Sequence, residues 1–552
     1  MGRRVARAGA IALSGVSGEV VRVEAGVSTQ KPGMAIIGLP DTAVAEAKQR
    51  VTLAVQHSGY VLSEHMLTVN LSPGALPKRG TGFDLAIALT ALSASGVVPG
   101  GQQLAETVHI GELGLDGTLR RPPGLLSAVI AAKKHGFSRV LVPEDSREEA
   151  GLVHDIEVIT ADTLVSAALW HGADPPESPP DSSAAPPRAT PASVVPVHLR
   201  GPESGHSDAL PNASPPTAAH PATGTAAVPG SAADLADVVG QASAVTGLIV
   251  AAAGGHHLLM LGPPGAGKTL LASRLPGILP PLGTAEALRA SAIASLESRE
   301  PLRELRRIPP FISPHHSATS AALIGGGSGT EIVPGAVTRA CHGVLFLDEV
   351  AQFQPAVLDG LRQPLESGRV EIVRARGRAV LPAQVQLVLA ANPCPCGFAG
   401  VLDGDRQCEC PATARRRYLS RVSGPLGDRI DLRLTLNRVS RLARDTAAGK
   451  LTSTADAAQR VLAARERAER RLAGSPWRLN AQLPGAWLRH PSHRPEPAAT
   501  AVLDAALSRG ALTLRGYDRT LRVAWTVADL AGVERPGRSE ISEALGLRLG
   551  GA

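Results

Sequence analysis

The sequence predicts a multidomain α/β protein, and three regions of different patterning support this fold class. Residues 1–172 mix strand-like alternation with helical spacing, which is typical of a mixed α/β domain. Residues 233–437 alternate short apolar runs with helical stretches, the pattern of a parallel sheet with crossover helices. Residues 438–552 have helical spacing. We therefore expect a mixed N-terminal domain, a parallel-sheet core and a helical C-terminal domain.

The N-terminal domain contains local patterns that define individual elements. Strands are predicted where apolar and polar residues alternate, and helices where apolar residues recur every three or four positions. The first predicted helix has Asp41 as a plausible N-cap. The predicted strands are 20–23, 67–71 and 139–142, and the predicted helices are 43–58 and 84–95.

Between the first two regions, residues 173–232 are rich in proline, alanine, serine, threonine and glycine. Such a composition cannot bury enough apolar area to offset the entropy lost on ordering. The segment is therefore predicted to be a disordered linker with extended proline-rich stretches, which would let the two flanking regions move relative to one another.

The overall composition limits the possible classes of protein. The chain has 552 residues, of which 44% are hydrophobic, and carries a net charge of +7. The positive charge favours acidic partners such as nucleic acid, although many other enzymes share it. No apolar run reaches the roughly 18 residues that a membrane span needs, and Arg7 interrupts the apolar N-terminal stretch. We expect a cytoplasmic protein.

A phosphate-binding loop is the clearest motif. Residues 262–269 fit the pattern G-x-x-x-x-G-K-[ST], follow the apolar run 258–261 and precede a helical stretch. The glycines allow backbone N–H groups to point at phosphates, Lys268 is expected to reach the β- and γ-phosphates, and the Thr269 hydroxyl is expected to ligate Mg²⁺. The predicted ATP-binding residues are Gly262, Pro263, Pro264, Gly265, Ala266, Gly267, Lys268 and Thr269.

Polar residues also end two later apolar strands. Asp348 and Glu349 follow the run 344–347, and Asn392 follows the run 386–391. About 80 residues after a phosphate-binding loop, Asp348 is expected to hold the magnesium shell and Glu349 to polarise the attacking water. Asn392 would orient water near the γ-phosphate. The order of these three motifs is that of AAA+ ATPases, so the sequence predicts an ATP hydrolase.

Two arginines are candidates for completing this site. Arg429 follows the sheet and is expected to act in trans, on the nucleotide of a neighbouring subunit, where such an arginine is worth about 10³–10⁵ in rate. Arg519, in the helical C-terminal region, is expected to close over the phosphates of its own subunit, with Arg522 as its rival. The alternative for each is a surface salt bridge.

Together these motifs resemble the ComM/YifB family of magnesium-chelatase-like AAA+ proteins. The resemblance rests on segments 36–41, 70–73, 314–317, 361–366, 392–397 and 515–519. Members of this kind are hexameric ATPases, and a helicase among them drives branch migration of DNA in natural transformation and recombination. The resemblance implies the same activity here, with a helical C-terminal lid. His315 and His316 are expected to form a structural turn rather than a metal site.

Four of the five cysteines lie close together in the sequence, as Cys394-x-Cys396 and Cys408-x-Cys410. Four thiolates are the usual ligands of a tetrahedral structural Zn²⁺ site, although the C-x-C spacing is shorter than the common two-residue gap. The alternative is a set of reduced cysteines in an exposed loop. We predict a structural zinc.

A basic segment, 368–380, alternates like two short strands around a glycine-containing turn. In related ring motors a hairpin at this position projects into the central pore. Arg374, Arg376 and Arg378 would then contact DNA phosphates, which bind arginine without regard to sequence. A solvated hairpin without such a role is an equally good interpretation.

The N-terminal domain resembles the Lon protease domain in segments 77–84, 111–114 and 134–143. The resemblance places Gly82 at the position of the serine nucleophile and Ala128 at that of the activating lysine. Without a nucleophile and a base, acyl transfer is not available. We predict no peptidase activity and a role in assembly or DNA contact.

Three functions remain open on the sequence. The favoured one is a DNA motor, a hexameric branch-migration or unwinding ATPase, and an ATPase rate that no DNA changes would argue against it. The second is the ATPase subunit of a magnesium chelatase, against which stand the cysteines and the Lon-like domain. The third is a remodeller of protein partners, although the aromatic residues expected of a protein-threading pore are scarce.

Overall fold

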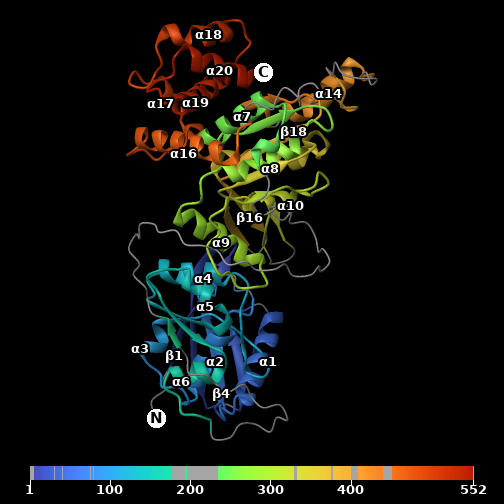
Figure 1. Cartoon of the computed structure of the whole chain (residues 1–552). Coiled ribbons are helices and arrows are strands. Elements are labelled where there is room, and N and C mark those ends of the chain that lie inside the picture. Colours follow the sequence, from blue (N-terminus) through green and yellow to red (C-terminus); the bar gives the residue numbers. More distant parts are fainter. Residues whose placement is uncertain are drawn as a thin grey trace.

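The computed structural model describes residues 5–176 except 30, 40, 75, 77 and 79, together with 193–195, 234–327, 332–374, 377–399, 408–423, 426–438 and 451–550. The N-terminal region lies at one end of the molecule, the parallel-sheet core in the middle and the C-terminal helices at the other end (Figure 1). The chain is thus a mixed α/β protein with helices at its C-terminus, as its patterning predicts. Most of the predicted linker lies outside the described residues.

The N-terminal region is built on one eight-stranded mixed sheet with the order β10-β9-β8-β5-β1-β2-β4-β3. A long antiparallel hairpin of β1 and β2 forms its centre, and β5, β8 and β9 continue it as parallel strands. The strands are β1 (Ala6–Ser14), β2 (Ser17–Ser28), β3 (Gly33–Ile37), β4 (Met66–Ser72), β5 (Thr107–His109), β8 (Arg139–Pro143), β9 (Glu157–Ala161) and β10 (Ser193–Val195). The predicted strands at 20–23, 67–71 and 139–142 are confirmed.

Helices cover this sheet, and they differ from the predictions in detail. The main ones are α1 (Asp41–His57), α2 (Asp84–Ala94), α4 (Leu125–Lys134) and α6 (Leu164–Trp170). Helix α1 begins at Asp41, two residues before the predicted start. The apolar N-terminal stretch that Arg7 interrupts forms strand β1. Residues 193–195, inside the predicted linker, pair with β9 as strand β10.

The core contains a five-stranded sheet with the order β12-β15-β18-β11-β19, in which all neighbours are parallel. Its strands are β11 (Leu258–Leu261), β12 (Phe311–Ile312), β15 (Val344–Leu347), β18 (Gln386–Ala391) and β19 (Leu432–Thr435). The register pairs Leu261 with Ala391 and Leu347 with Leu389. The carboxyl ends of β11, β15 and β18 therefore meet at one edge of the sheet.

The C-terminal helices pack on the core through apolar side chains. They are α16 (Thr454–Arg471), α17 (Gly485–Arg489), α18 (Pro497–Ser508), α19 (Leu514–Ala531) and α20 (Arg538–Leu549). Helices α16 and α19 contact α7 (Ala242–Gly254), and α16 also contacts α8 (Lys268–Ile278). Val461 and Leu521 are buried in the same apolar cluster as Leu248 of α7, so these helices share the hydrophobic core of the sheet domain.

The N-terminal region is joined to the core through α4 and α9 (Thr284–Glu297), which lie side by side (Figure 1). Ser127 donates a hydrogen bond to the carbonyl of Ala292 across this contact, at 3.3 Å. Gly124, with φ +74°, lies at the same contact, and a Cβ there would meet Leu13 and Leu296 at 2.7 Å. The close approach of the two helices thus requires glycine at this position.

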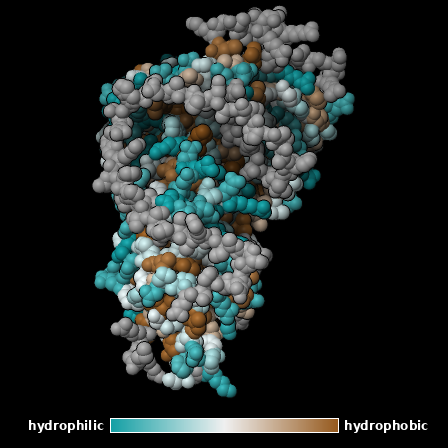
Figure 2. All heavy atoms as spheres, turned by 60° about the horizontal axis from the view of Figure 1, so that its bottom comes forward, coloured by the Kyte–Doolittle hydropathy of each residue, from teal (hydrophilic) through white to brown (hydrophobic). Residues whose placement is uncertain are grey.

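The described residues contain no helix that is both long enough and apolar enough to cross a membrane. On the face drawn in Figure 2, hydrophobic residues form separate groups among hydrophilic ones.

Candidate nucleotide-binding site and cysteine cluster

The phosphate-binding loop lies between β11 and α8, at the carboxyl edge of the core sheet. Gly265 and Gly267 have φ values of +78° and +87°, a backbone conformation that favours glycine. The backbone N–H of Gly262 donates to the carbonyl of Ala391, which ties the start of the loop to the end of β18. Helix α8 begins at Lys268, so its free N–H groups face the loop.

Lys268 is buried within this loop and connects it to Asn392. Its Nζ atom donates to the carbonyls of Gly262 at 2.6 Å and Pro263 at 3.0 Å, and to Oδ1 of Asn392 at 3.0 Å. Burial lowers the pKa of Lys268, while the charges of Asp348 and Glu349 raise it. The ammonium group is therefore held by directed acceptors beside two carboxylates.

Thr269 and Asp348 meet at the same edge. The Thr269 hydroxyl donates to Oδ2 of Asp348 at 2.7 Å, and Oδ1 of Asp348 accepts the backbone N–H of Glu349 at 2.8 Å. Glu349 has φ +49°, a strained backbone for a glutamate, at the sharp turn from β15 into the 3₁₀ helix η3 (Val350–Gln352). This turn places two successive carboxylates at the strand end.

A cavity of about 380 Å³ is lined by the loop, Asp348, Glu349 and Asn392. The structure therefore brings together the predicted residues Pro264, Gly265, Ala266, Gly267, Lys268, Thr269, Asp348, Glu349 and Asn392. Sequence reasoning missed His316, whose Nδ1 lies 3.9 Å from the Glu349 carboxylate. Only the fold shows this neighbour, because the segment 314–317 carries no pattern that points to β15.

Arg429 and Arg519 lie at the opposite edge of the core sheet. Arg519 Nη1 donates to Asp431 Oδ1 at 2.5 Å and to the carbonyl of Arg429 at 2.9 Å. Asp431 precedes β19, and its N–H donates to the carbonyl of His257, which precedes β11. Both arginines therefore stand near the amino end of β19, beside that of β11, and β11 leads into the phosphate-binding loop at its carboxyl end. Arg429 also pairs with Glu366.

This placement corrects the expectation for Arg519. The two arginines line a shared cavity of about 650 Å³ that contains neither Lys268 nor Asn392. Arg519 does not close over the loop of its own chain, because α19 packs on the other end of the sheet. Its predicted rival, Arg522, lines the same cavity and donates to the carbonyl of Leu483 at 2.7 Å.

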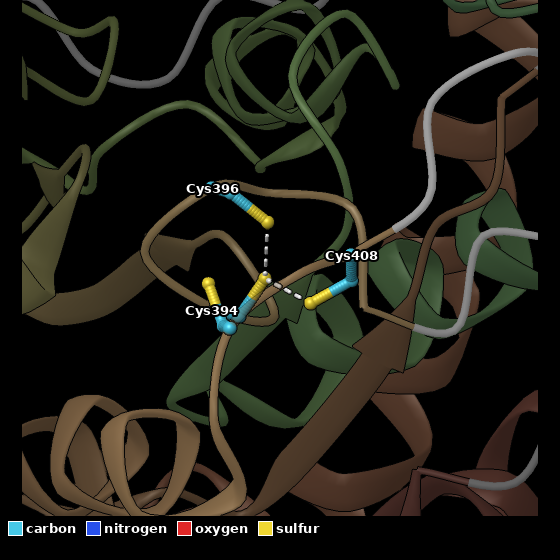
Figure 3. A group of neighbouring side chains, drawn as sticks. Cys394, Cys396 and Cys408 are labelled. Atoms are coloured by element: carbon cyan, nitrogen blue, oxygen red, sulfur yellow. Dashed lines mark hydrogen bonds between the residues drawn. The ribbon is translucent and has the colours of Figure 1, made fainter.

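The four clustered cysteines converge, as the sequence predicts. Figure 3 shows the thiols of Cys396 and Cys408 pointing toward Cys394, with Sγ–Sγ distances of 3.3 and 3.6 Å. The Sγ atoms of these three residues and Cys410 all lie within 4.8 Å of one another. Zn–S bonds of about 2.3 Å in a tetrahedron require sulfurs about 3.8 Å apart. The four sulfurs could therefore hold one metal ion.

The cysteines of this cluster influence one another. Cys394 is buried, and its Sγ accepts the backbone N–H of Ala399 at 3.3 Å. A hydrogen bond from the backbone of Phe398 lowers the pKa of Cys396 to about 7, whereas the neighbouring thiols raise the pKa of Cys408 to about 11 and also raise that of Cys410. A thiolate is the form of cysteine that binds metals. The fifth cysteine, Cys341, is buried elsewhere, and burial raises its pKa.

The predicted basic hairpin is present as β16 (Arg369–Arg374) and β17 (Gly377–Pro382), paired with Arg374 opposite Gly377. Arg378 is exposed and forms an ion pair with Glu371 at 2.5 Å. The side chain of Arg374 and the whole of Arg376 lie outside the described residues. The hairpin contacts the N-terminal sheet, because Ser14 donates to the carbonyl of Arg378 at 3.0 Å.

Gly82 and Ala128 line one cavity of about 490 Å³ in the N-terminal region. Leu296 and Glu297 of α9 also line it, so the core covers part of this cavity. The two positions that would carry a serine and a lysine in a Lon protease thus face the same space, and in this chain neither side chain offers a nucleophile or a base.

Comparisons with known proteins agree with this arrangement. The chain matches the family described as magnesium chelatase, subunit ChlI, over residues 234–443, the subunit ChlI family of Mg-chelatase over 23–146, and the ChlI C-terminal family over 451–548. A Lon protease from Trichlorobacter lovleyi is 29% identical over 146 residues, which cover 25% of this chain and 18% of that protein.

Several relatives match nearly the whole chain. An uncharacterized protein of Mycobacterium tuberculosis is 44% identical and covers 99% of both chains. The uncharacterized protein YifB of Escherichia coli is 37% identical, and the competence protein ComM of Haemophilus influenzae is 35% identical, each covering 97% of this chain and 96% of the relative. The chain therefore belongs to the ComM/YifB family of magnesium-chelatase-like AAA+ proteins.

Proposed function

We propose that this protein is an AAA+ ATPase that works as a ring and couples ATP hydrolysis to the remodelling of DNA. The observation that carries the proposal is the convergence of Lys268, Thr269, Asp348 and Asn392 at one edge of the core sheet. Both the phosphate-binding loop and the acidic strand end supply groups to the same 380 Å³ cavity.

The residues at this edge fit ATP and Mg²⁺. Lys268 lies in the loop with its ammonium group on three protein oxygens, and a phosphate oxygen would replace at least one of them when ATP binds. Thr269 and Asp348 place a hydroxyl and a carboxylate oxygen 2.7 Å apart, a donor set of the oxygen type that Mg²⁺ prefers. Magnesium bound there would neutralise charge on the β- and γ-phosphates.

The hydrolytic step would depend on Glu349 and Asn392. The Glu349 carboxylate, held by the turn after β15, would accept a proton from the attacking water. Asn392 would keep Lys268 and that water aligned through its side-chain amide. His316, 3.9 Å from Glu349, is placed to influence the orientation of this carboxylate.

The positions of the two arginines support a ring. Arg429 and Arg519 stand at the edge of the sheet opposite the phosphate-binding loop, so they would reach a γ-phosphate held by the next subunit in a head-to-tail ring. In this proposal both arginines act in trans. The shared cavity between them would form one side of the subunit interface.

DNA is the proposed substrate. The proposal is supported by the net charge of +7 and the exposed arginine of the β16–β17 hairpin, and by similarity to a relative named a competence protein. The N-terminal region, which resembles a Lon domain without its catalytic pair, would serve in assembly or DNA contact, and we expect no peptide cleavage by the full chain. A structural Zn²⁺ in the cysteine cluster completes the proposal.

The test is the ATPase rate of the full chain with forked DNA, four-way DNA, an unfolded protein, and a porphyrin with Mg²⁺. Stimulation by DNA alone supports the proposal. The matching family descriptions name magnesium chelatase, so stimulation only by the porphyrin would favour a chelatase subunit. Stimulation only by the unfolded protein would favour a protein remodeller.

Replacing Arg374, Arg376 and Arg378 by Glu should abolish DNA binding measured by fluorescence anisotropy, and unchanged affinity would remove the hairpin from the DNA-binding surface.

A further inference from the structure

The cysteine cluster is built directly onto the nucleotide site. Cys394 is separated from Asn392 by one residue, and the loop that follows passes over the phosphate-binding loop. Gly397 has φ +86°, and a Cβ there would lie 2.6 Å from Cδ of Pro264. The backbone of Gly397 thus packs on the ring of Pro264, so a movement of the cysteine loop would act directly on the phosphate-binding loop.

Helix α14 (Ala412–Ser423) begins immediately after the cluster and also lies against the nucleotide site. Tyr418 packs on the apolar cluster beneath β15 and β18. Burial raises the pKa of Tyr418, and the backbone N–H of Asn392, which faces its hydroxyl oxygen, lowers it. Arg421, one turn further on, donates through Nη1 to the carbonyl of Ala351 in η3 at 3.4 Å. One face of α14 therefore contacts residues beside both Asn392 and Glu349.

The solvent-exposed part of α14 is basic. Arg415, Arg416 and Arg417 are exposed, and α14 contains no acidic residue. In the part of the chain that the structure describes, none of the three arginine side chains forms a hydrogen bond or an ion pair. Figure 1 shows α14 at the end of the core that faces away from the N-terminal region. Three exposed guanidinium groups around one helix, without an acidic residue in that helix, favour a polyanion such as a chain of phosphates.

We propose that Cys394, Cys396, Cys408 and Cys410 hold one Zn²⁺ that fixes α14 on the nucleotide site, and that DNA phosphates bound by the arginines of α14 stimulate ATP hydrolysis through this connection. The inference rests on the proposed ATPase function and adds to it a second DNA-contacting surface, distinct from the β16–β17 hairpin. Zinc acts as a structural brace, because four cysteine ligands leave no open coordination position for catalysis.

Figure 3 and the geometry of the sulfurs support a single ion. The four ligand atoms come from two short segments, one continuous with β18 and one continuous with α14. A metal bound to both segments would join strand and helix directly, across residues 400–407. Without the metal, contacts such as those of Tyr418 and Arg421 would connect α14 to the strand ends.

The metal is tested first, by its stoichiometry in the purified full chain. We expect one zinc per chain by elemental analysis, and loss of that zinc in Cys396→Ser and in Cys408→Ser. Cys341→Ser is the matched control and should retain it. Mercurial titration of the wild-type chain, followed by a zinc-sensitive dye, provides the same measurement without any variant and does not depend on the variants folding. Absence of zinc release from the wild-type chain would overturn the metal site.

The proposed DNA contact of the α14 arginines is tested by the ratio of DNA-stimulated to basal ATPase rates. Replacing Arg415, Arg416 and Arg417 by Gln should bring this ratio close to one, and replacing them by Lys should preserve most of the stimulation. The slope of log affinity against log salt should fall by about 2–3 in the Gln variant, since each lost phosphate contact contributes about 0.7–0.9. The control removes equal charge from the C-terminal helices, by Gln at the exposed Arg494, Arg509 and Arg515.

The outcomes separate this inference from the proposed function. If DNA stimulates the wild-type chain and also the Gln variant of α14, the inference is wrong and the proposed function stands. If DNA stimulates neither, while the zinc measurement succeeds, the proposed DNA function is wrong and the brace alone remains. A loss of stimulation in the C-terminal control equal to that in the α14 variant would show a general charge effect and overturn the specific surface.

Discussion

Arg121 and Glu149 form a buried ion pair at the contact between the N-terminal region and helix α9. Arg121 Nε lies 2.5 Å from Glu149 Oε2, and their side chains are 6% and 0% exposed. Ser295 of α9 donates to the other carboxylate oxygen at 2.6 Å, and Arg121 donates to the carbonyl of Ser298 at 2.9 Å. The pair therefore satisfies hydrogen-bonding groups of both regions at once.

Glu149→Gln should destabilise the full chain strongly. The substitution leaves the Arg121 guanidinium buried without its counter-charge, and breaking a buried pair in this way costs about 3–5 kcal/mol. Urea unfolding of the full chain measures the change. Asp155→Asn is the control, because its pair with Lys133 is exposed and such pairs contribute about 0–1 kcal/mol. Equal losses in the free energy of unfolding for the two variants would show that the buried pair does not stabilise the contact between the N-terminal region and α9.

Glu349→Gln should slow hydrolysis while leaving nucleotide binding intact. Removal of a general base lowers the rate by about 10²–10⁴-fold, but the amide is similar in size and Glu349 makes no contact with Lys268. Steady-state ATPase assays and the binding of a fluorescent ATP analogue separate the two effects. Glu64→Gln, at an exposed position in the N-terminal region, is the matched control. A parallel loss of binding would assign Glu349 to the nucleotide pocket instead of the hydrolytic step.

The trans action of the arginines has a direct test in mixed rings. Arg429→Ala and Glu349→Gln chains should each be inactive, since one lacks the arginine and the other the base. Mixing them creates interfaces in which an intact Glu349 meets an intact Arg429 of the neighbour, so ATPase activity should reappear. Arg519→Ala mixed with Glu349→Gln should behave in the same way, because Arg519 lies beside Arg429. If Arg519→Ala is not rescued, the residue acts within its own chain.

The nucleotide site is predictable from the sequence because its determinants are local. A glycine-rich loop, an acidic strand end and an amide-tipped strand each carry their own signal, and the carboxyl ends of parallel strands must meet at one edge. The cysteine cluster is predictable for a similar reason, since the residue type and close spacing already limit its chemistry.

The position of Arg519 is not predictable in this way. The pattern of α19 shows that it is an amphipathic helix but not which end of the sheet it reaches, because that depends on how α16 and α19 pack on α7. Strand β1 was not among the predicted strands for another reason. From Ala8 to Ala12 it is apolar and buried on both faces, so the period-two alternation that identifies a half-exposed strand is weak there.

Two buried imidazoles should make the chain less stable in mild acid. His109 Nδ1 lies 3.3 Å from the carbonyl of Gly9, which can only accept, so Nδ1 carries the proton of the neutral ring. His109 Nε2 is then an acceptor, and the Nε2–H of His171 donates to it at 2.9 Å. Protonation of His109 would place two N–H groups against each other. Burial lowers the pKa of His171 to about 4 and that of His109 well below its usual value.

Because both folded-state pKa values lie below the unfolded value of about 6.5, the unfolded chain binds more protons as the pH falls. The two neutral imidazoles therefore make their full contribution to the free energy of unfolding above about pH 6.5. This free energy decreases from there toward pH 4, by up to about 1.4 kcal/mol per pH unit for each imidazole. Thermal unfolding of the full chain between pH 7 and pH 4.5 measures this slope. His171→Gln should make the slope shallower, whereas Gln at the exposed His154 should leave it as in the wild type. An unchanged slope in His171→Gln would mean that other groups cause the acid sensitivity.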